Sequence, residues 1–140
     1  FQCKTLKLSI IYVHDSEKPG RSLIELIDPD KIHKDKVPFR FIFYRDDFYN
    51  DELIFHDFSS FKQDELNQNR TNFDLMIIDS NRVDFIKNVI NEFKSVKKKM
   101  VLCSPREEQE IVNHKIQCLI YSKPLTKTKV CNEIISFAKD

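Results

Sequence analysis

Four side chains with the chemistry to bind or transfer a phosphoryl group follow closely on short apolar stretches of the sequence. Asp15 and Asp79 carry carboxylates, Ser104 a hydroxyl and Lys123 an ammonium group. Carboxylate oxygens are ligands that Mg²⁺ prefers, while an ammonium group and a hydroxyl can hold phosphate oxygens. In an open parallel sheet the strand ends meet at one edge, where ligands bind. The sequence therefore predicts an edge site that holds a divalent cation and positions a phosphoryl group.

The apolar stretches that precede these residues predict five strands, because they are short, rich in β-branched and aromatic residues and bounded by polar residues or proline. They are Leu6–Val13, Phe39–Tyr44, Phe73–Ile78, Met100–Cys103 and Ile116–Tyr121. Two of them, Phe73–Ile78 and Met100–Cys103, are apolar at nearly every position, which is typical of parallel strands covered on both faces. The segment 28–58 fits least well, and there we expect a single elaborated strand with long polar flanks.

Segments with helical periodicity lie between the strands. Residues 23–27, 86–93 and 130–138 repeat apolar side chains at intervals of three and four, as one buried helix face requires. Residues 59–69 and 107–113 are weaker candidates. Alternating strands and helices predict an α/β fold, a doubly wound five-stranded parallel sheet of the (βα)5 type, with residues 1–140 as a single domain.

The composition excludes several classes of function. Lys and Arg number 23 against 22 Asp and Glu, so no overall field favours nucleic acid or an anionic membrane surface. A single glycine excludes a Walker loop and a dinucleotide-binding turn, since both need glycine at several positions. We expect neither nucleic-acid binding nor direct membrane contact by this domain.

The cysteines and the first residues predict where the protein resides. Four cysteines without a C-x-x-C pair favour buried reduced thiols over disulfides or a metal site. The start FQCKTLK lacks the apolar region of a signal peptide, so we expect a cytoplasmic, reducing compartment. Because the chain begins at Phe1 rather than Met, we also expect it to be excised from a longer protein.

Three segments together resemble the receiver domain of two-component response regulators, and the resemblance covers most of the chain. They are FDLMIIDS, KMVLCSP and CLIYSKPLTKTKVCNEI, of which the Lys-Pro at the end of the last predicted strand is the most specific element. The resemblance implies a flavodoxin-like receiver fold and membership of a two-component phosphorelay. It also implies an origin in a response regulator or in the cytosolic part of a hybrid histidine kinase.

The resemblance assigns roles to particular residues. Asp79 corresponds to the phosphoacceptor of the family, Ser104 to its switch hydroxyl and Lys123 to its lysine. Mg²⁺ would be the cofactor, bound by Asp15, Asp79 and the backbone carbonyl of Asn81. The phosphoryl donor would be a histidine kinase or a histidine phosphotransfer protein, and the only enzymatic activity would be self-phosphorylation from phosphohistidine.

Differences from the family leave a second function open. His14 stands where receivers have an acid, and a protonated imidazole would repel Mg²⁺. The loop after Asp79 reads SNRVDFIKNV and lacks the usual proline and glycine, while Ile120 stands at the position of the switch aromatic. The alternative is a pseudo-receiver that has lost phosphotransfer and serves as a protein-interaction module.

The segment Phe39–Phe61 combines many aromatic residues with many acidic ones. One strand cannot bury all of these rings, and an exposed aromatic patch usually marks a partner surface. We therefore expect part of this segment to be core and part to bind a partner protein.

Overall fold

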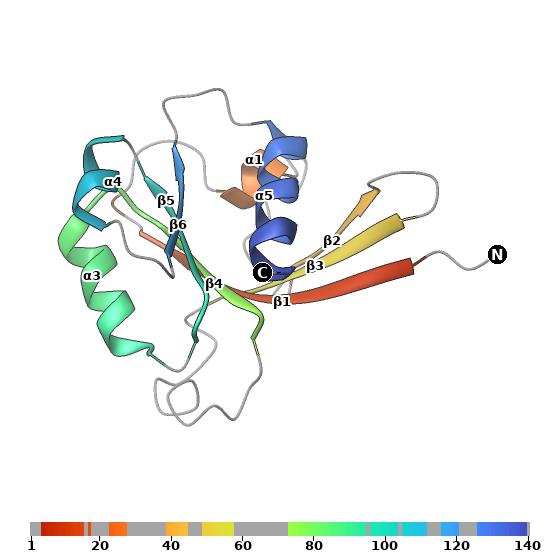
Figure 1. Cartoon of the computed structure of the whole chain (residues 1–140), viewed down its shortest axis with the longest axis horizontal. Coiled ribbons are helices and arrows are strands. Elements are labelled where there is room, and N and C mark those ends of the chain that lie inside the picture. Colours follow the sequence, from red (N-terminus) through yellow and green to blue (C-terminus); the bar gives the residue numbers. More distant parts are fainter. Residues whose placement is uncertain are drawn as a thin grey trace.

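A six-stranded sheet with helices on both faces forms the centre of the computed structural model (Figure 1). The strand order is β2-β3-β1-β4-β5-β6. The structure describes residues 4–15, 17, 23–27, 39–44, 49–57, 73–94, 96–103, 105–111, 116–120 and 126–139. The strands are β1 (Lys4–His14), β2 (Phe39–Tyr44), β3 (Tyr49–Asp57), β4 (Leu75–Asp79), β5 (Lys99–Cys103) and β6 (Ile116–Ile120). The helices are α1 (Leu23–Ile27), α3 (Val83–Glu92), α4 (Pro105–Ile111) and α5 (Lys127–Lys139).

The sheet is parallel except at one edge. Strands β3, β1, β4, β5 and β6 run parallel to their neighbours, whereas β2 pairs antiparallel with β3. Without β2, the order is that of a doubly wound fold whose chain winds outward in both directions from β1. The predicted α/β class with a parallel sheet and two layers of helices is confirmed.

The predicted number of strands was wrong, because the segment 28–58 contributes two strands to the described sheet rather than one. Strand β2 has the predicted bounds but lies antiparallel at the edge, and β3 was missed. In β3, Asp51, Leu53 and Phe55 are buried, whereas the residues between them are half-buried. Burial thus alternates along β3, as expected for a strand with one face toward the core. The pattern is not visible in the sequence, because one of the buried positions holds an acid rather than an apolar residue.

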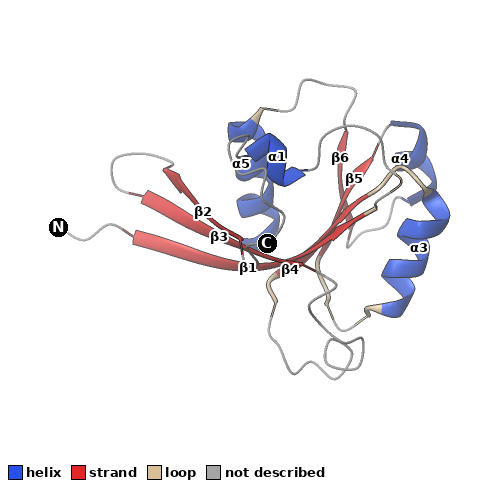
Figure 2. Cartoon of the chain, turned by 180° about the vertical axis from the view of Figure 1, so that it is seen from behind, coloured by secondary structure: helices blue, strands red, loops and turns tan. Residues whose placement is uncertain are grey.

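Two apolar cores lie on opposite faces of the sheet. One is packed between the sheet and helices α1 and α5, and it includes Tyr12 and Ile77. The other lies under α3 and α4 and includes Val13 and Ile78. Because consecutive strand residues point to opposite faces, β1 and β4 supply both cores, which explains why β4 and the second half of β1 are apolar at nearly every position. Figure 2 shows the two helical layers from behind.

The predicted helices agree with the described ones, with shifted ends. Helix α4 spans Pro105–Ile111, so each of its ends lies two residues earlier than in the predicted segment 107–113. The predicted helix at 59–69 lies outside the described residues. Cys103 and Cys131 are buried free thiols, as expected, and burial raises the pKa of Cys131 to about 12. Among the described residues, no helix has the length and apolarity needed to span a membrane.

Helix α5 is held at its C-terminal end by a lysine from a distant part of the chain. Lys98 Nζ donates to the carbonyl oxygens of Phe137 at 3.1 Å and Ala138 at 3.0 Å. The last carbonyls of a helix have no partner within the helix and carry its negative dipole end, so a cation there is favourable. Lys98 therefore attaches α5 to the loop before β5.

We predict that Lys98→Met lowers the free energy of unfolding by about 1 kcal/mol, because the variant keeps the apolar stem but removes the ammonium group. The matched control is Lys97→Met, since Lys97 is the exposed neighbour. Urea-induced unfolding measures both. Equal losses in the two variants would show that the contact with α5 contributes nothing.

Candidate functional site

The ends of β1 and β4 form the candidate site. His14 lies opposite Asp79 in the parallel register, and the Asp15 amide donates to the Asp79 carbonyl oxygen at 3.0 Å. Asp79 is the last residue of β4 and Asp15 follows β1 directly. The prediction that both acids lie at strand ends along one edge of the sheet is therefore confirmed, and the structure shows in addition that the two strands are neighbours.

The two carboxylates nevertheless lie on opposite faces of the sheet. Asp79 continues the row of Ile77, which belongs to the core under α1 and α5. Asp15 continues the row of Val13, which belongs to the core under α3 and α4. Asp79 lies opposite His14 in the register, so Asp15 is one residue beyond the position opposite Asp79. Because successive side chains of a strand point to opposite faces of the sheet, this offset of one residue places the two carboxylates on opposite faces.

Asp79 is buried and tied to the start of α1. Its side chain has no exposed surface, and Oδ2 accepts hydrogen bonds from Tyr12 Oη at 2.5 Å and from the Leu23 amide at 3.1 Å. The Leu23 amide also donates to Tyr12 Oη at 3.1 Å. Leu23 is the first residue of α1, so this carboxylate satisfies a helix amide that has no partner within the helix.

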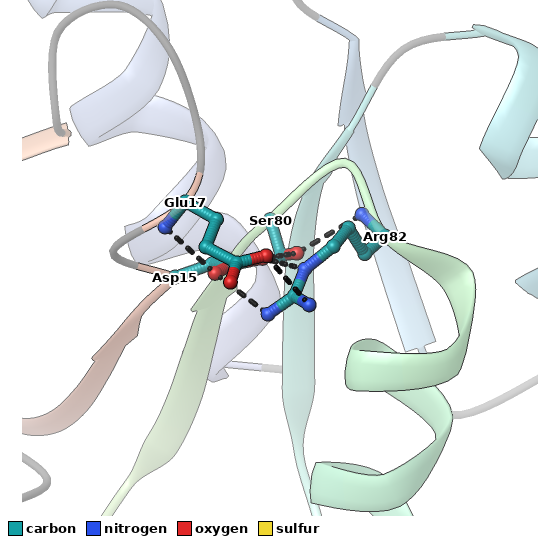
Figure 3. A network of polar contacts seen from close by, with 4 residues as sticks. All are labelled: Asp15, Glu17, Ser80 and Arg82. Carbon is teal, nitrogen blue, oxygen red and sulfur yellow. Dashed lines mark hydrogen bonds and ion pairs between the residues drawn. The ribbon is translucent and has the colours of Figure 1, made fainter.

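Asp15 is also buried, and four donors surround its carboxylate (Figure 3). Oδ1 accepts from the Glu17 amide at 3.0 Å and from Arg82 Nη2 at 3.0 Å. Oδ2 accepts from Ser80 Oγ at 2.7 Å and from Arg82 Nε at 2.7 Å. The guanidinium and the carboxylate therefore meet in the bidentate geometry of a strong ion pair.

Arg82 is held in place by further contacts. Its Nη1 lies 2.9 Å from Glu17 Oε2, and its guanidinium carbon lies 5.3 Å from the centre of the Phe85 ring. Its own amide donates to Ser80 Oγ at 3.0 Å, immediately before α3 begins. The same serine hydroxyl thus joins Asp15 to the backbone of the arginine that neutralises it.

These contacts determine the charge state of the site. The Arg82 hydrogen bonds, helped by those from Ser80 and the Glu17 amide, lower the pKa of Asp15 from 3.8 to about 2. Burial opposes this shift, because it disfavours the charged form. Asp15 in turn raises the pKa of Arg82, so each group stabilises the charge of the other.

The other predicted site residues have mixed outcomes. Asn81 is half-buried beside the site, and its Oδ1 is enclosed without a hydrogen-bond partner in the described structure. Ser104 and Lys123 lie outside the described residues, so their predicted roles stay predictions. His14 is exposed, and its ring stacks with that of Tyr12 at 6.1 Å between centres.

Sequence reasoning missed the residues that make most of the contacts. Ser80 and Arg82 were part of an unusual loop, and Tyr12 was one position in an apolar run. The sequence signal for Arg82 was a cation three residues after a strand-ending acid. Which way the Arg82 side chain points, however, depends on how the loop after β4 turns toward Asp15.

The described residues do not fit the Mg²⁺ that the receiver resemblance implies. Asp15 already accepts four hydrogen bonds, and Asp79 faces the opposite core. Within the described ranges, no group of three or more His, Cys, Asp or Glu side chains is placed to hold a metal ion. The arrangement is that of a neutralised ion pair rather than of an open set of oxygen ligands.

No protein-family model matches the chain, and a search of curated proteins finds no match.

We predict that stability falls as the pH is lowered from about 4 toward 2, with a contribution from Asp15 of about 1–2 kcal/mol. The folded-state pKa lies below the ordinary value of 3.8, so this stabilisation is complete only well above pH 3.8 and is lost as the pH falls through the folded-state pKa of about 2. The half-exposed Arg82 limits its size, because solvent screens the pair.

Urea unfolding at a series of pH values measures this effect in wild type, Asp15→Asn and Asp84→Asn. Asp84 is an exposed acid at the start of α3 and serves as the control. Below pH 4, the free energy of unfolding should decrease less in Asp15→Asn than in wild type, and by the same amount in Asp84→Asn as in wild type. The same pH slope in wild type and Asp15→Asn would contradict the assigned ion pair.

We further predict that Tyr12→Phe lowers the free energy of unfolding by about 1–3 kcal/mol, because it leaves a buried carboxylate short of a donor. A double-mutant cycle with Asp79→Asn isolates the interaction between the two side chains. The loss of stability in the double variant should differ from the sum of the two single losses by about 0.5 kcal/mol or more, since the two groups are in direct contact. Strict additivity would mean that the hydroxyl and the carboxylate do not interact.

Proposed function

We propose that this chain is a receiver-like protein-interaction module that does not accept a phosphoryl group on Asp79. The observation that carries the proposal is the complete burial of the Asp79 side chain, whose Oδ2 accepts hydrogen bonds from Tyr12 and the Leu23 amide. The α/β fold and the strand order are compatible with the receiver domains that the sequence resembles.

The chemistry of phosphotransfer explains why this burial matters. A carboxylate that attacks phosphohistidine must reach the phosphorus atom, and the charges of both anions must be neutralised during the approach. Here Asp79 would have to leave its hydrogen bonds on the α1 face. Asp15, the acid expected to help bind Mg²⁺, is already occupied by Arg82.

A second candidate function is phosphotransfer itself, with Asp79 as acceptor, Mg²⁺ as cofactor and a histidine kinase or histidine phosphotransfer protein as donor. The register favours this candidate, because it places Asp15 and Asp79 at adjoining strand ends beside the switch point of the sheet. It requires both carboxylates to change partners. In this candidate Ser104 and Lys123 would contact the phosphoryl group.

For the interaction module, we propose that the partner binds within Phe39–Phe61. Leu53 and Phe55 of this segment are buried in the core, so the binding role falls on other parts of it. Strand β2 is the outermost strand on its side of the described sheet, and edge strands can pair with a strand of another protein. We propose a cytoplasmic protein as the partner, in keeping with the expected compartment.

The test is treatment with Mg²⁺ and beryllofluoride, a phosphoryl mimic, followed by amide NMR. We predict that the amide signals of Tyr12, Leu23 and Asp79 keep their positions, and that wild type and Asp79→Asn respond identically. Incubation with acetyl phosphate and intact-mass measurement should likewise give no phosphorylated species.

Shifts at these amides in wild type that disappear in Asp79→Asn would overturn the proposal and establish the second candidate. A phosphorylated species that depends on Asp79 would do the same. Asp84→Asn serves as a control, because it removes an exposed acid outside the site.

A further inference from the structure

The acceptor capacity of the Asp15 carboxylate is full. A carboxylate offers about four lone-pair positions on its two oxygens. Oδ1 receives two hydrogen bonds and Oδ2 receives two, and Arg82 supplies one on each oxygen. A metal ion could bind Asp15 only by displacing one of these donors.

The charges around Arg82 resemble those around a bound cation. Its guanidinium contacts two acids, with Nε and Nη2 on Asp15 and Nη1 on Glu17. Figure 3 shows the three groups converging from the loop after β1 and the loop after β4. The planar fork of arginine matches a carboxylate with two parallel hydrogen bonds, which a lysine cannot do.

Arg82 is also positioned before any ligand arrives. The Phe85 ring lies under the guanidinium, and the Ser80 hydroxyl bonds both to the Arg82 amide and to Asp15. Preorganisation reduces the entropy that must be lost to form the pair. An incoming hydrated ion would have to shed water and replace a partner that is already in place.

We infer that Arg82 takes the place of a divalent ion at the end of β1: its guanidinium occupies the Asp15 carboxylate and prevents a metal ion from binding there. This inference does not rest on the proposed function, because it concerns cation binding without any phosphoryl donor or partner protein. Removing the guanidinium frees one position on each oxygen of Asp15. That change should create a divalent-cation site.

The experiment compares thermal unfolding midpoints in MgCl₂ and in NaCl of equal ionic strength. The variants are Arg82→Gln, the double variant Asp15→Asn with Arg82→Gln, and Arg106→Gln as a control for loss of an exposed arginine. We expect wild type and Arg106→Gln to have the same midpoint in both salts. Arg82→Gln should gain about 2–4 °C at saturating MgCl₂, and the double variant should gain nothing.

A second measurement uses Mn²⁺, whose paramagnetism broadens the NMR signals of nearby amides. The amides of Asp15 and Glu17 should stay sharp in wild type and broaden in Arg82→Gln. If Arg82→Gln does not fold, the wild-type spectrum still decides, because broadening there would overturn the inference and its absence would support it.

Two further results would overturn the inference. One is a folded Arg82→Gln protein that responds to neither Mg²⁺ nor Mn²⁺, since Arg82 would then not be what excludes the ion. The other is an unfolding midpoint that rises in MgCl₂ for wild type but not for an added Asp15→Asn single variant, since the ion would then bind Asp15 despite Arg82. Neither result depends on phosphorylation, so it leaves the proposed function to its own test.

Discussion

A carboxylate buried at the end of a strand must receive hydrogen bonds, or its charge is too costly to keep. Asp15 receives four, and the donors come from the loop after β1, the loop after β4 and the residue before α3. The pair with Arg82 therefore joins the two central strands to the helix that covers them. The β4–α3 loop brings Arg82 to Asp15, and this contact keeps the Asp15 carboxylate charged.

The consequence for function comes from the sheet register. Because His14 rather than Asp15 lies opposite Asp79, the two acids turn to opposite faces and acquire separate partners. Asp79 secures the start of α1 through its bonds to Tyr12 and Leu23, while Asp15 secures the start of α3. Both acids that the receiver resemblance assigns to phosphotransfer make structural contacts here. This is why we propose an interaction module rather than a phosphoacceptor.

The sequence predicted what depends on pattern and chain position, and it could not predict what depends on side-chain direction. Strands β4 and β5 were predictable, because strands buried on both faces are apolar throughout. Strand β3 was not, since a buried Asp51 and a half-buried opposite face removed its apolar signal. The strand-end positions of Asp15 and Asp79 followed from chain order alone. The pairing with Arg82 did not, because it requires the register and the turn of a loop.

The most direct test of the central claim is a pH titration of the Asp15 carboxyl carbon by ¹³C NMR in wild type and Arg82→Gln. We expect a midpoint near 2 in wild type and a higher midpoint in the variant, because the guanidinium makes the largest contribution to the lowered pKa of Asp15. A wild-type midpoint at the ordinary value of 3.8, unchanged by Arg82→Gln, would contradict it.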